Sequence, residues 1–497
     1  MSSGSVPQRT YGNWRRPRRS GLGPLGLIGT IGTFGGIVAV LLASLISLTA
    51  ALVVLVPLVV LLGPLALRTE DGRNLYQILA VRLGWRRRVA HGEHLYVSGP
   101  LSQRPGGRFP PPGLLSRVTM GEGHDAFDRP FGVLHHRGRN RFTVVLECVP
   151  DGGGLVDQEQ VDVWVAMWGD WLARLSHEPN LRGASVVVET APDSGMTLAA
   201  EVLPRLAPDA PEVARAVMEE VVDRYPAASS EMHTYVTLTY AAPGGTKHEL
   251  EDVIADLAVR MPGLCGGLVG AGGGSAEPLS AERIAEVIRI AYDPAVVSEV
   301  MEARAAYGGT GLEWEDAGPA ACVETTDAYA HDSGVSRTWV LTMAPRGTVG
   351  SGVLRTVLEA APGTRRKRVA LIYRPIDPAT SARIVEADRR NAQFMATSGR
   401  GMVRARAAAE VAAAEQAAAE EASGAGLVEF SLLLTVTVDS AEELVDANVT
   451  VRNLIAGSRL SMRPANRMQA AAFACSLPAG ILPWEHTLVP HEFQEAL

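Results

Sequence analysis

The uncharged stretch between Gly21 and Leu67 constrains this chain more than any other feature. A helix of roughly 20 mostly apolar residues crosses a hydrocarbon core of about 30 Å, and this stretch is long enough for two such helices. Glycines and prolines inside it argue against one long rigid rod. We therefore predict a transmembrane hairpin over residues 21–67, with helices near 25–43 and 48–67 and a short turn between them.

Arginines flank the apolar stretch on both sides, and they indicate its orientation. Basic residues that flank it include Arg15, Arg16, Arg18 and Arg19 before it and Arg68, Arg86, Arg87 and Arg88 after it. Positive residues close to membrane spans stay on the cytoplasmic side. We therefore expect a protein of the plasma (inner) membrane with both termini cytoplasmic. The lipid bilayer is its first expected partner. A cleaved or single-span anchor that exports the remainder is the alternative, and these flanks disfavour it.

Composition bounds what the remainder can be. The 497 residues leave room for two or three domains, and the net charge of -8 disfavours direct binding of nucleic acid. Only two of the 46 basic residues are lysines, which, with 51 glycines, is typical of a GC-rich genome such as that of an actinobacterium. The four cysteines are far apart and form no CxxC pair, so free thiols are expected.

Hydrophobic periodicity predicts an α+β protein. After a basic tail (1–20) and the hairpin, residues 68–126 contain a juxtamembrane helix and a Pro/Gly-rich linker, and order resumes near Phe127. Strands and amphipathic helices then alternate. Corresponding strands recur at a constant offset, Phe142 with Thr338 and Thr234 with Phe430. This spacing predicts two βαβ-α-βαβ-like halves, 127–310 and 311–497, each a small sheet with helices packed on it.

Two segments interrupt this alternation. The glycine-rich residues 263–275 are predicted to form a loop. Residues 403–422 are rich in alanine and have high helix propensity, which predicts a helix of roughly 30 Å whose only apolar face is alanine. Either a solvent-exposed linker helix or an arm that docks a partner fits this pattern.

No pattern in the sequence carries catalytic chemistry. A P-loop nucleotide site needs GxxxxGK[ST], and neither Lys247 nor Lys367 stands in that context. No GxSxG elbow is present, and no His, Cys or acidic set has the spacing of a zinc site. We therefore assign no catalytic, cofactor-binding or metal-binding residue and expect no enzyme activity.

The last 70 or so residues contain short motifs in a familiar order. Leu427-Val428-Glu429-Phe430 opens an alternating strand, Ser440 and Glu443 open a helix, and a final helix leads to a Leu-Pro. This order resembles the end of the non-motor N-terminal domain of the CagE/TrbE/VirB-type ATPases of conjugation and type IV secretion. The positions that carry the resemblance are Arg374, Pro375, Gln469, Phe473, Leu477 and Pro478. The apolar hairpin resembles the small PrgI-type membrane component that accompanies these ATPases.

The resemblance implies a split system, because the chain stops at Leu497, where the family's ATPase domain would begin. It implies a non-catalytic membrane scaffold that docks a separately encoded Walker-motif ATPase at the cytoplasmic face. Other membrane channel subunits, and copies of this chain or of others in an oligomer, are further expected partners. Two alternatives remain open: an EccE-like component of a type VII secretion system, and a membrane-tethered enzyme of unrecognised class.

Overall fold

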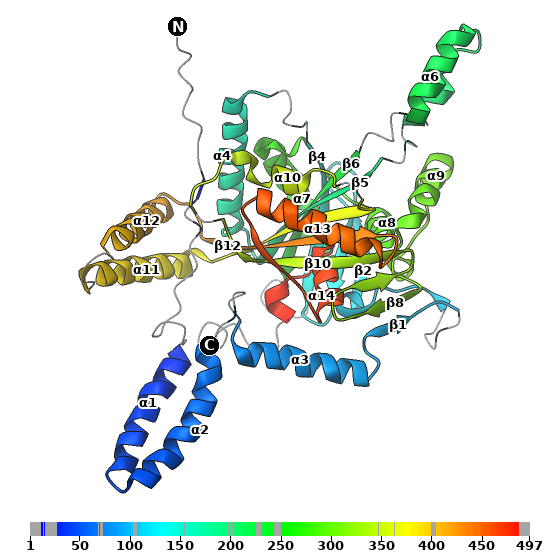
Figure 1. Ribbon diagram of the computed structural model, residues 1–497. Helices are drawn as coiled ribbons and strands as arrows, with labels where there is room; N and C mark the ends of the chain where they lie inside the picture. The colour runs from blue at the N-terminus through cyan, green and yellow to red at the C-terminus, as the bar shows by residue number, and fades with distance from the viewer. Residues whose placement is uncertain are drawn as a thin grey trace. The chain divides into compact units, whose positions relative to one another are not determined.

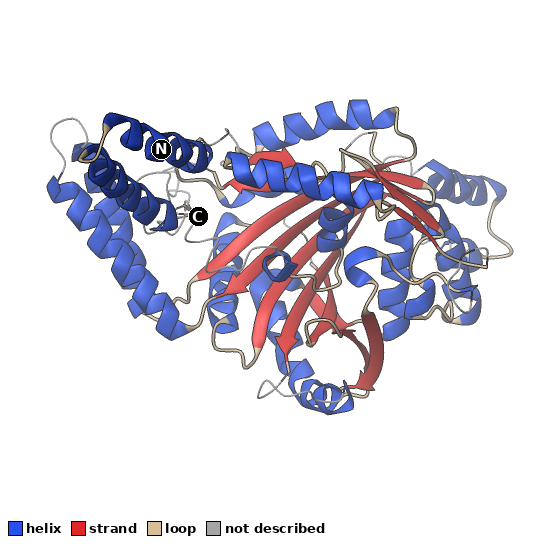
Figure 2. Cartoon of the chain, turned by 90° about the horizontal axis from the view of Figure 1, so that it is seen from below, coloured by secondary structure: helices blue, strands red, loops and turns tan. Residues whose placement is uncertain are grey.

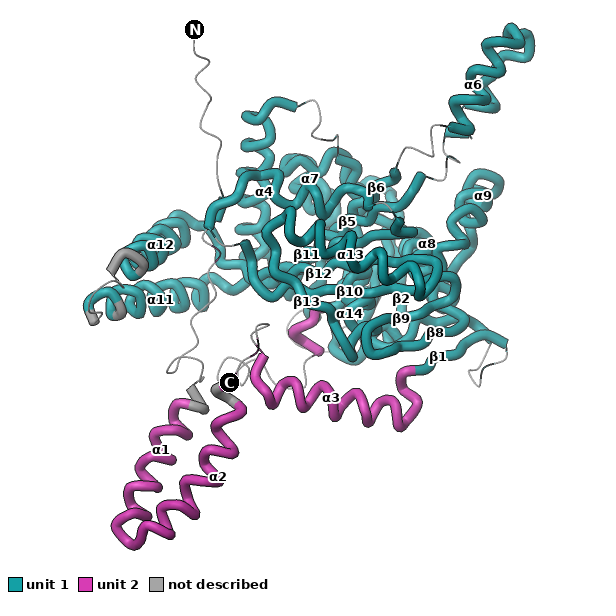
Figure 3. The backbone as a smooth tube through the Cα atoms, viewed as in Figure 1, with its two compact units in different colours: residues 1–13, 95–481 teal, residues 14–94, 482–497 magenta. Residues whose placement is uncertain are grey.

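The computed structural model describes residues 11–12, 14, 27–67, 69, 73–100, 102, 107–150, 152, 156–193, 195, 198–199, 202–224, 230–242, 250–345, 347–361, 363–398 and 404–486 (Figure 1). The chain divides into two compact units, residues 1–13 with 95–481 and residues 14–94 with 482–497 (Figure 3). The larger unit combines a sheet with helices, so the predicted α+β class is confirmed.

The smaller unit is helical. It contains α1 (Leu27–Ser44), α2 (Leu48–Ala66), α3 (Leu75–Ala90) and the short turn η10 (Pro483–His486). Polar caps set two of the helix starts: Ser47 Oγ accepts a hydrogen bond from the Ala50 N–H at 3.1 Å, and α3 begins with a capping box. In that box Asn74 Oδ1 accepts from the Gln77 N–H at 2.8 Å, and Gln77 Oε1 accepts from the Asn74 N–H at 3.2 Å.

One continuous sheet of 13 strands organises the larger unit (Figure 2). Its path runs β1-β8-β9-β10-β12-β11-β5-β6-β4-β3-β2, with β13 beside β10 and β7 beside β4, and every neighbouring pair is antiparallel. The strands are β1 (Leu95–Val97), β2 (Val118–His124), β3 (Pro130–His136), β4 (Arg141–Val149), β5 (Leu181–Pro192), β6 (Ser230–Ala241), β7 (Ser275–Pro278), β8 (Ala321–Glu324), β9 (Tyr329–His331), β10 (Gly334–Met343), β11 (Arg366–Pro375), β12 (Val428–Val438) and β13 (Ser461–Pro464).

The strand order repeats across the sheet. The order β7-β4-β6-β5 in the first part corresponds to β13-β10-β12-β11 in the second, and a preceding pair, β2-β3 or β8-β9, extends each part. Within each set, two parallel strands are separated by an antiparallel one, which is the split βαβ arrangement. The two sets join where β5 pairs with β11, from Lys367 opposite Thr190 to Tyr373 opposite Ala184. The expectation of two separate small sheets is therefore wrong, because this pairing makes one sheet.

Helices cover both faces of the sheet. On one face, α4 (Gln158–Leu175) and α7 (Leu250–Leu268) bury Trp171, Leu257 and Met261 against β4 and β6. On the same face, α10 (Arg355–Leu358) and α13 (Glu443–Gly457) pack on β12 through Val357 and Val451. On the opposite face, α8 (Ala281–Tyr292) and α14 (Gln469–Ser476) pack against the sheet. In the chain, α8 is followed by η7 (Pro294–Val296) and α9 (Val297–Tyr307).

Two helical arms occupy equivalent connections of the repeat. Between β5 and β6 the chain forms η3 (Leu203–Arg205) and α6 (Glu212–Arg224). Between β11 and β12 it forms α11 (Pro378–Ser398) and α12 (Arg404–Ala422), which lie side by side (Figures 1 and 3). Because β5 and β11 are antiparallel neighbours, the arms leave the sheet at opposite ends. The alanine face of α12 is partly buried, with Ala407 8% and Ala414 1% exposed, so α12 is more than an exposed linker.

Two boundaries differ from the prediction. The ordered part of the larger unit begins at β1, well before Phe127, because β1 and β2 both join the sheet. The predicted loop 263–275 is instead mostly helical: α7 continues through Pro262 to Leu268, and a wide turn, η6 (Val269–Gly273), follows it. Met261, Cys265 and Leu268 continue the buried line of α7, and this burial outweighs the low helix propensity of the glycines.

Candidate functional site: the apolar helices and the buried charges of the sheet

The surfaces of α1 and α2 are apolar on all sides. Side chains that a water-soluble unit would bury are at least 40% exposed here, among them Ile31, Phe34, Ile37, Val38, Leu41, Leu42, Leu52, Val53, Leu55, Val56, Val59, Val60 and Leu61. At the connection, Leu45 and Ile46 are each 82% exposed. Exposed apolar patches of this extent mark a surface that contacts something other than water.

The two helices approach each other through glycines. A Cβ atom on Gly36 would clash with the Leu58 side chain, and one on Gly32 would lie 3.5 Å from Leu62 Cδ2. Small residues at a helix–helix contact, with large apolar residues facing outward, are typical of helices packed within a bilayer. With 18 and 19 residues, α1 and α2 each fall within the length range of a membrane-spanning helix.

Within the described residues, one helix is both long enough and apolar enough to cross a membrane. It spans Leu250–Gly273, and the described parts of the two N-terminal helices, Thr30–Ser44 and Leu48–Pro64, are apolar but shorter. The Leu250–Gly273 segment is α7 with its following turn. Its line of buried side chains, including Val253 and Leu257, packs against the sheet, and its first turn carries Glu251 and Asp252. Its contacts are those of an amphipathic core helix.

The basic flank lies partly in α3. Arg15, Arg16, Arg18, Arg19 and Arg68 fall outside the described residues, whereas Arg86, Arg87 and Arg88 belong to α3. This helix buries none of its side chains and contains no acidic residue. The Tyr76 hydroxyl donates a hydrogen bond to the Leu61 carbonyl at 2.8 Å, which holds the start of α3 to α2.

A short strand pairing attaches the beginning of the chain to the larger unit. The Tyr11 N–H donates to the Val349 carbonyl, and the Val349 N–H donates to the Tyr11 carbonyl, both at 2.8 Å. The chain therefore contacts the larger unit before α1 and joins it again after α3, at β1.

The residues of the C-terminal resemblance lie mostly in the core. Gln469 is fully buried, and its Oε1 accepts a hydrogen bond from the Thr338 N–H in β10 at 2.8 Å. Phe473 is also fully buried, with its ring 4.9 Å from His331 and 5.2 Å from Tyr292 between centroids. Leu477 and Pro478 are buried as well. A partner docked on the folded domain would therefore not touch these side chains.

Arg374 and Pro375 lie at the end of β11, where the α11–α12 arm begins. The Arg374 guanidinium contacts the Glu429 carboxylate across the strand pair at 3.3 Å, and both side chains remain about one third exposed (29% and 34%). Of the positions that carry the resemblance, Arg374 and Pro375 are the two that a partner can reach on the folded domain.

A cluster of buried charges crosses the junction of the two strand sets. Glu189 of β5 receives hydrogen bonds from both Arg366 and Arg368 of β11; the Arg368 Nε donates at 2.7 Å. All three side chains are more than nine-tenths buried. Burial alone would raise the pKa of the Glu189 carboxyl, but the two guanidinium groups hold it at about 2. Among the described residues, Arg366 Nε and Arg368 Nη1 are buried without a hydrogen-bond partner.

Polar side chains continue from this cluster along the same face of the sheet. Hydroxyl groups pair across strands at equivalent positions of the repeat: Thr143 with Thr239 and Thr338 with Thr435, each at 2.9 Å. Each pair satisfies groups that would otherwise be buried without partners. The two matched pairs extend the resemblance between the halves from strand order to side chains.

His233 of β6 lies between carboxylates on this face. Its Nδ1 is 3.5 Å from Glu147 Oε1, and its Nε2 is 3.7 Å from Glu231 Oε2. Hydrogen bonds to Glu147 and then to Glu231 raise the pKa of His233 to about 9, against the opposing effect of burial. The ring is therefore charged at neutral pH and forms part of a partly exposed ion-pair network.

The protonated His233 makes a pH-dependent contribution to stability. Because its folded-state pKa lies above the ordinary value of 6.5, the contribution is complete below about pH 6.5 and is lost as the pH rises through about 9. One third of the side chain is exposed (33%), so solvent screening reduces the expected effect to about 1 kcal/mol.

We expect the melting temperature of the wild type to fall relative to that of His233→Gln between pH 6.5 and 9.5, as measured by differential scanning fluorimetry in detergent. His331 serves as an internal comparison: burial lowers its pKa to about 4, so it does not titrate in this range. Parallel pH profiles for the two proteins would contradict the ion pair.

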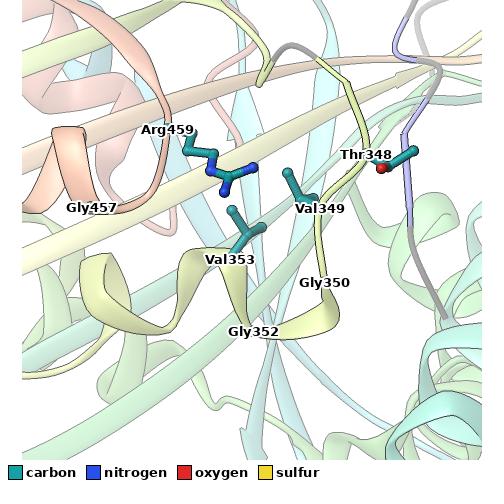
Figure 4. Close-up of a pocket in the computed structure, with 7 residues that line it drawn as sticks. All are labelled: Thr348, Val349, Gly350, Gly352, Val353, Gly457 and Arg459. Atoms are coloured by element: carbon teal, nitrogen blue, oxygen red, sulfur yellow. The ribbon is translucent and has the colours of Figure 1, made fainter. Parts of the chain in front are cut away.

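A pocket of about 440 Å³ lies between the loop before α10 and the end of α13 (Figure 4). It is lined by Thr348, Val349, Gly350, Gly352, Val353, Gly457 and Arg459. Its one charged group, the Arg459 guanidinium, extends toward Val349 and Val353 (Figure 4). The lining contains no carboxylate, imidazole or thiol that would supply acid–base or nucleophilic chemistry.

Metal-binding geometry is likewise not found where the structure describes the chain, since no group of three or more His, Cys, Asp or Glu side chains there converges on one point. The four cysteines, Cys148, Cys265, Cys322 and Cys475, are buried free thiols. Burial raises the pKa of Cys148 and of Cys475 to about 12, which makes both thiols unreactive.

Comparison with known families matches residues 18–77 to a domain of unknown function, DUF8461. The matched segment contains α1, α2 and the first residues of α3, and it leaves the sheet domain unmatched. No curated protein matches the chain. The apolar helices and the start of α3 therefore belong to one matched segment.

Sequence reasoning did not anticipate the buried charge cluster. Its members were visible as charged residues directly beside apolar strand segments: Glu189 follows 184–188, and Arg366 and Arg368 precede 369–373. A charge within a strand that packs on both faces indicates a buried pair. Arg366 and Arg368 follow Glu189 by 177 and 179 residues, so only the β5–β11 pairing identifies them as its partners.

Proposed function

We propose that this chain is a non-catalytic scaffold of the plasma (inner) membrane, in which α1 and α2 form a transmembrane hairpin. The observation that carries the proposal is the apolar surface of these two helices, which is exposed on all sides and contains no charge. Exposure of this apolar surface to water is unfavourable, and its transfer into a hydrocarbon core lowers the free energy by about 25 cal/mol per Å².

The pairing of Tyr11 with Val349 supports an out-and-back path. Residues on both sides of the apolar helices contact the same compact unit, so the chain has to cross the bilayer an even number of times. The arginines beside both ends favour the cytoplasmic side for that unit. Reporter fusions at the N-terminus and the C-terminus should therefore both be active in the cytoplasm; a C-terminal fusion active on the outside would overturn the hairpin.

The proposed partner is a separately encoded Walker-motif ATPase of a conjugation or type IV-like secretion apparatus. Support comes from the C-terminal resemblance and from two protruding arms, α6 and α11–α12, that offer exposed apolar side chains to a partner. On α6 these are Val213, Val217, Met218 and Val221, and on α11 the exposed residue is Phe394. Anchoring the domain beside the membrane raises the effective concentration of such a partner there.

Affinity purification of the tagged, detergent-solubilised protein from its native cells, followed by mass spectrometry, tests this partner. We expect a Walker-motif ATPase to be recovered with the wild type. It should be lost when short loops replace both arms, from Pro192 to Ser230 for α6 and from Pro375 to Val428 for α11–α12, while a variant that keeps both arms and carries Arg355→Gln and Arg452→Gln serves as the matched control. Recovery of type VII components would favour the EccE-like alternative. ATP turnover by the purified chain would contradict the scaffold.

A further inference from the structure

We propose that α3 lies in the plane of the membrane surface and binds anionic lipid headgroups. This inference rests on the proposed function, because it takes the bilayer around α1 and α2 as its reference plane. It adds to that function a lipid specificity that a hydrophobic anchor alone does not provide.

The first observation is an exposed apolar line. Leu75, Leu79 and Leu83 recur every four residues, so they lie along one side of α3, and all three are at least 46% exposed. No part of the described structure covers them. No side chain of this 16-residue helix is fully buried, so packing within the described structure contributes little to its stability.

The second observation is charge. Arg82, Arg86, Arg87 and Arg88 lie in the second half of α3, and no acidic residue lies anywhere in the helix. Arg82 and Arg86 flank the leucine line, so their long side chains can run along apolar surface and still place the guanidinium in the headgroup layer. Trp85, with the Arg88 guanidinium 5.3 Å from its ring centre, belongs to the residue type that is enriched at membrane interfaces.

The attachment of α3 to α2 indicates that lipid is what α3 contacts. The hydrogen bond from Tyr76 to the Leu61 carbonyl ties the start of α3 to the helix that we place in the bilayer. A helix held there, apolar on one line and purely basic at its end, fits the interface between acyl chains and phosphates. Anionic lipid is favoured because each arginine near a negatively charged surface shifts binding by about fivefold.

Site-directed spin labelling of the full-length protein in nanodiscs tests the proposal. The four native cysteines are buried, so a single added cysteine takes the label selectively. Leu83→Cys reports on the apolar line, Gly84→Cys on the other side of α3, where an added Cβ meets no atom within 4 Å, and Val56→Cys on α2. Depth is read from the relative collision rates with oxygen and with a water-soluble nickel complex.

We expect the Leu83→Cys label to lie deeper in discs that contain phosphatidylglycerol than in pure phosphatidylcholine, and the Gly84→Cys label to remain in water. The difference in depth of the Leu83→Cys label between the two lipids should disappear in a variant that also carries Arg82→Gln, Arg86→Gln, Arg87→Gln and Arg88→Gln. As a matched control, Arg224→Gln, Arg355→Gln, Arg390→Gln and Arg452→Gln remove four exposed arginines of the larger unit and should preserve it.

A Leu83→Cys label in water in both kinds of disc, or equally deep in both, would overturn the proposal. The Val56→Cys label separates this failure from failure of the hairpin. If that label lies in the hydrocarbon core while the Leu83→Cys label stays in water, only the lipid-binding role of α3 fails. If the Val56→Cys label is itself in water, the membrane scaffold fails.

Discussion

Replacement of Glu189 by alanine is expected to destabilise the sheet domain strongly. The carboxylate neutralises two buried guanidinium groups, Arg366 and Arg368, at the β5–β11 junction. Removing one partner of a buried ion pair leaves an uncompensated charge, which costs about 3–5 kcal/mol. Two arginines share this carboxylate, and each already has a buried nitrogen without a partner, so the cost should lie at the upper end.

Differential scanning fluorimetry in detergent would measure this loss. We expect Glu189→Ala to lower the melting temperature by about 5–10 °C. Glu429→Ala is the matched control, because it removes the carboxylate of a partly exposed pair with Arg374 and should cost less than about 1 kcal/mol. Equal melting temperatures for the two variants would show that the charges at the junction are not desolvated.

We also expect that removing all three buried charges together restores part of the stability that Glu189→Ala loses. Replacing Glu189, Arg366 and Arg368 together by apolar residues of similar size removes all three charges at once. Such replacements of buried ion pairs are often neutral or stabilising. The triple variant should therefore melt above Glu189→Ala, whereas a simple packing role of Glu189 would make the triple variant worse.

An arginine in the middle of α2 is expected to prevent stable membrane integration. Val56 is 54% exposed and lies near the centre of this helix. Placing arginine at the centre of a membrane-spanning helix costs about 2.5–3.5 kcal/mol on the insertion scale. Val56→Arg should therefore shift the protein from the carbonate-resistant membrane fraction to the soluble or aggregated fraction.

Val217→Arg provides the control for this change. Val217 lies on α6 and is 51% exposed, so in water the two substitutions are nearly equivalent. A protein that never enters a bilayer would tolerate both. If Val56→Arg and Val217→Arg fractionate alike, with the wild type also released by carbonate, the transmembrane hairpin is wrong.

Local patterns predicted most elements correctly. The mostly apolar run Phe142–Val149 and the alternating residues 232–240 correspond to β4 and β6, and the Ser440/Glu443 pair does open α13, with the Glu443 N–H 3.4 Å from Ser440 Oγ. These signals come from residues within one turn or one strand of each other. The extension of α7 beyond Pro262 was missed because its cause, burial against the sheet, is not local.

The candidate sites divide in the same way. The apolar helices α1 and α2 and the basic character of α3 follow from composition alone, because a helix that is apolar on all sides is recognisable wherever it lies. The roles of Gln469 and Phe473 do not follow from composition. Their order suggested a shared motif, but only the packing shows that Gln469 bonds to the backbone of β10.

By itself, the sequence determined the α+β class, the two apolar helices, the absence of a P-loop, and the positions of the six longest strands, β4, β5, β6, β10, β11 and β12. Only the tertiary structure decided that the two halves share one sheet, and that Glu189 meets Arg366 and Arg368 across it. The physical reason lies in the range of the interactions. Periodicity and caps act between neighbours in the chain, whereas every free strand edge offers the same backbone donors and acceptors, so long-range packing selects which edges pair.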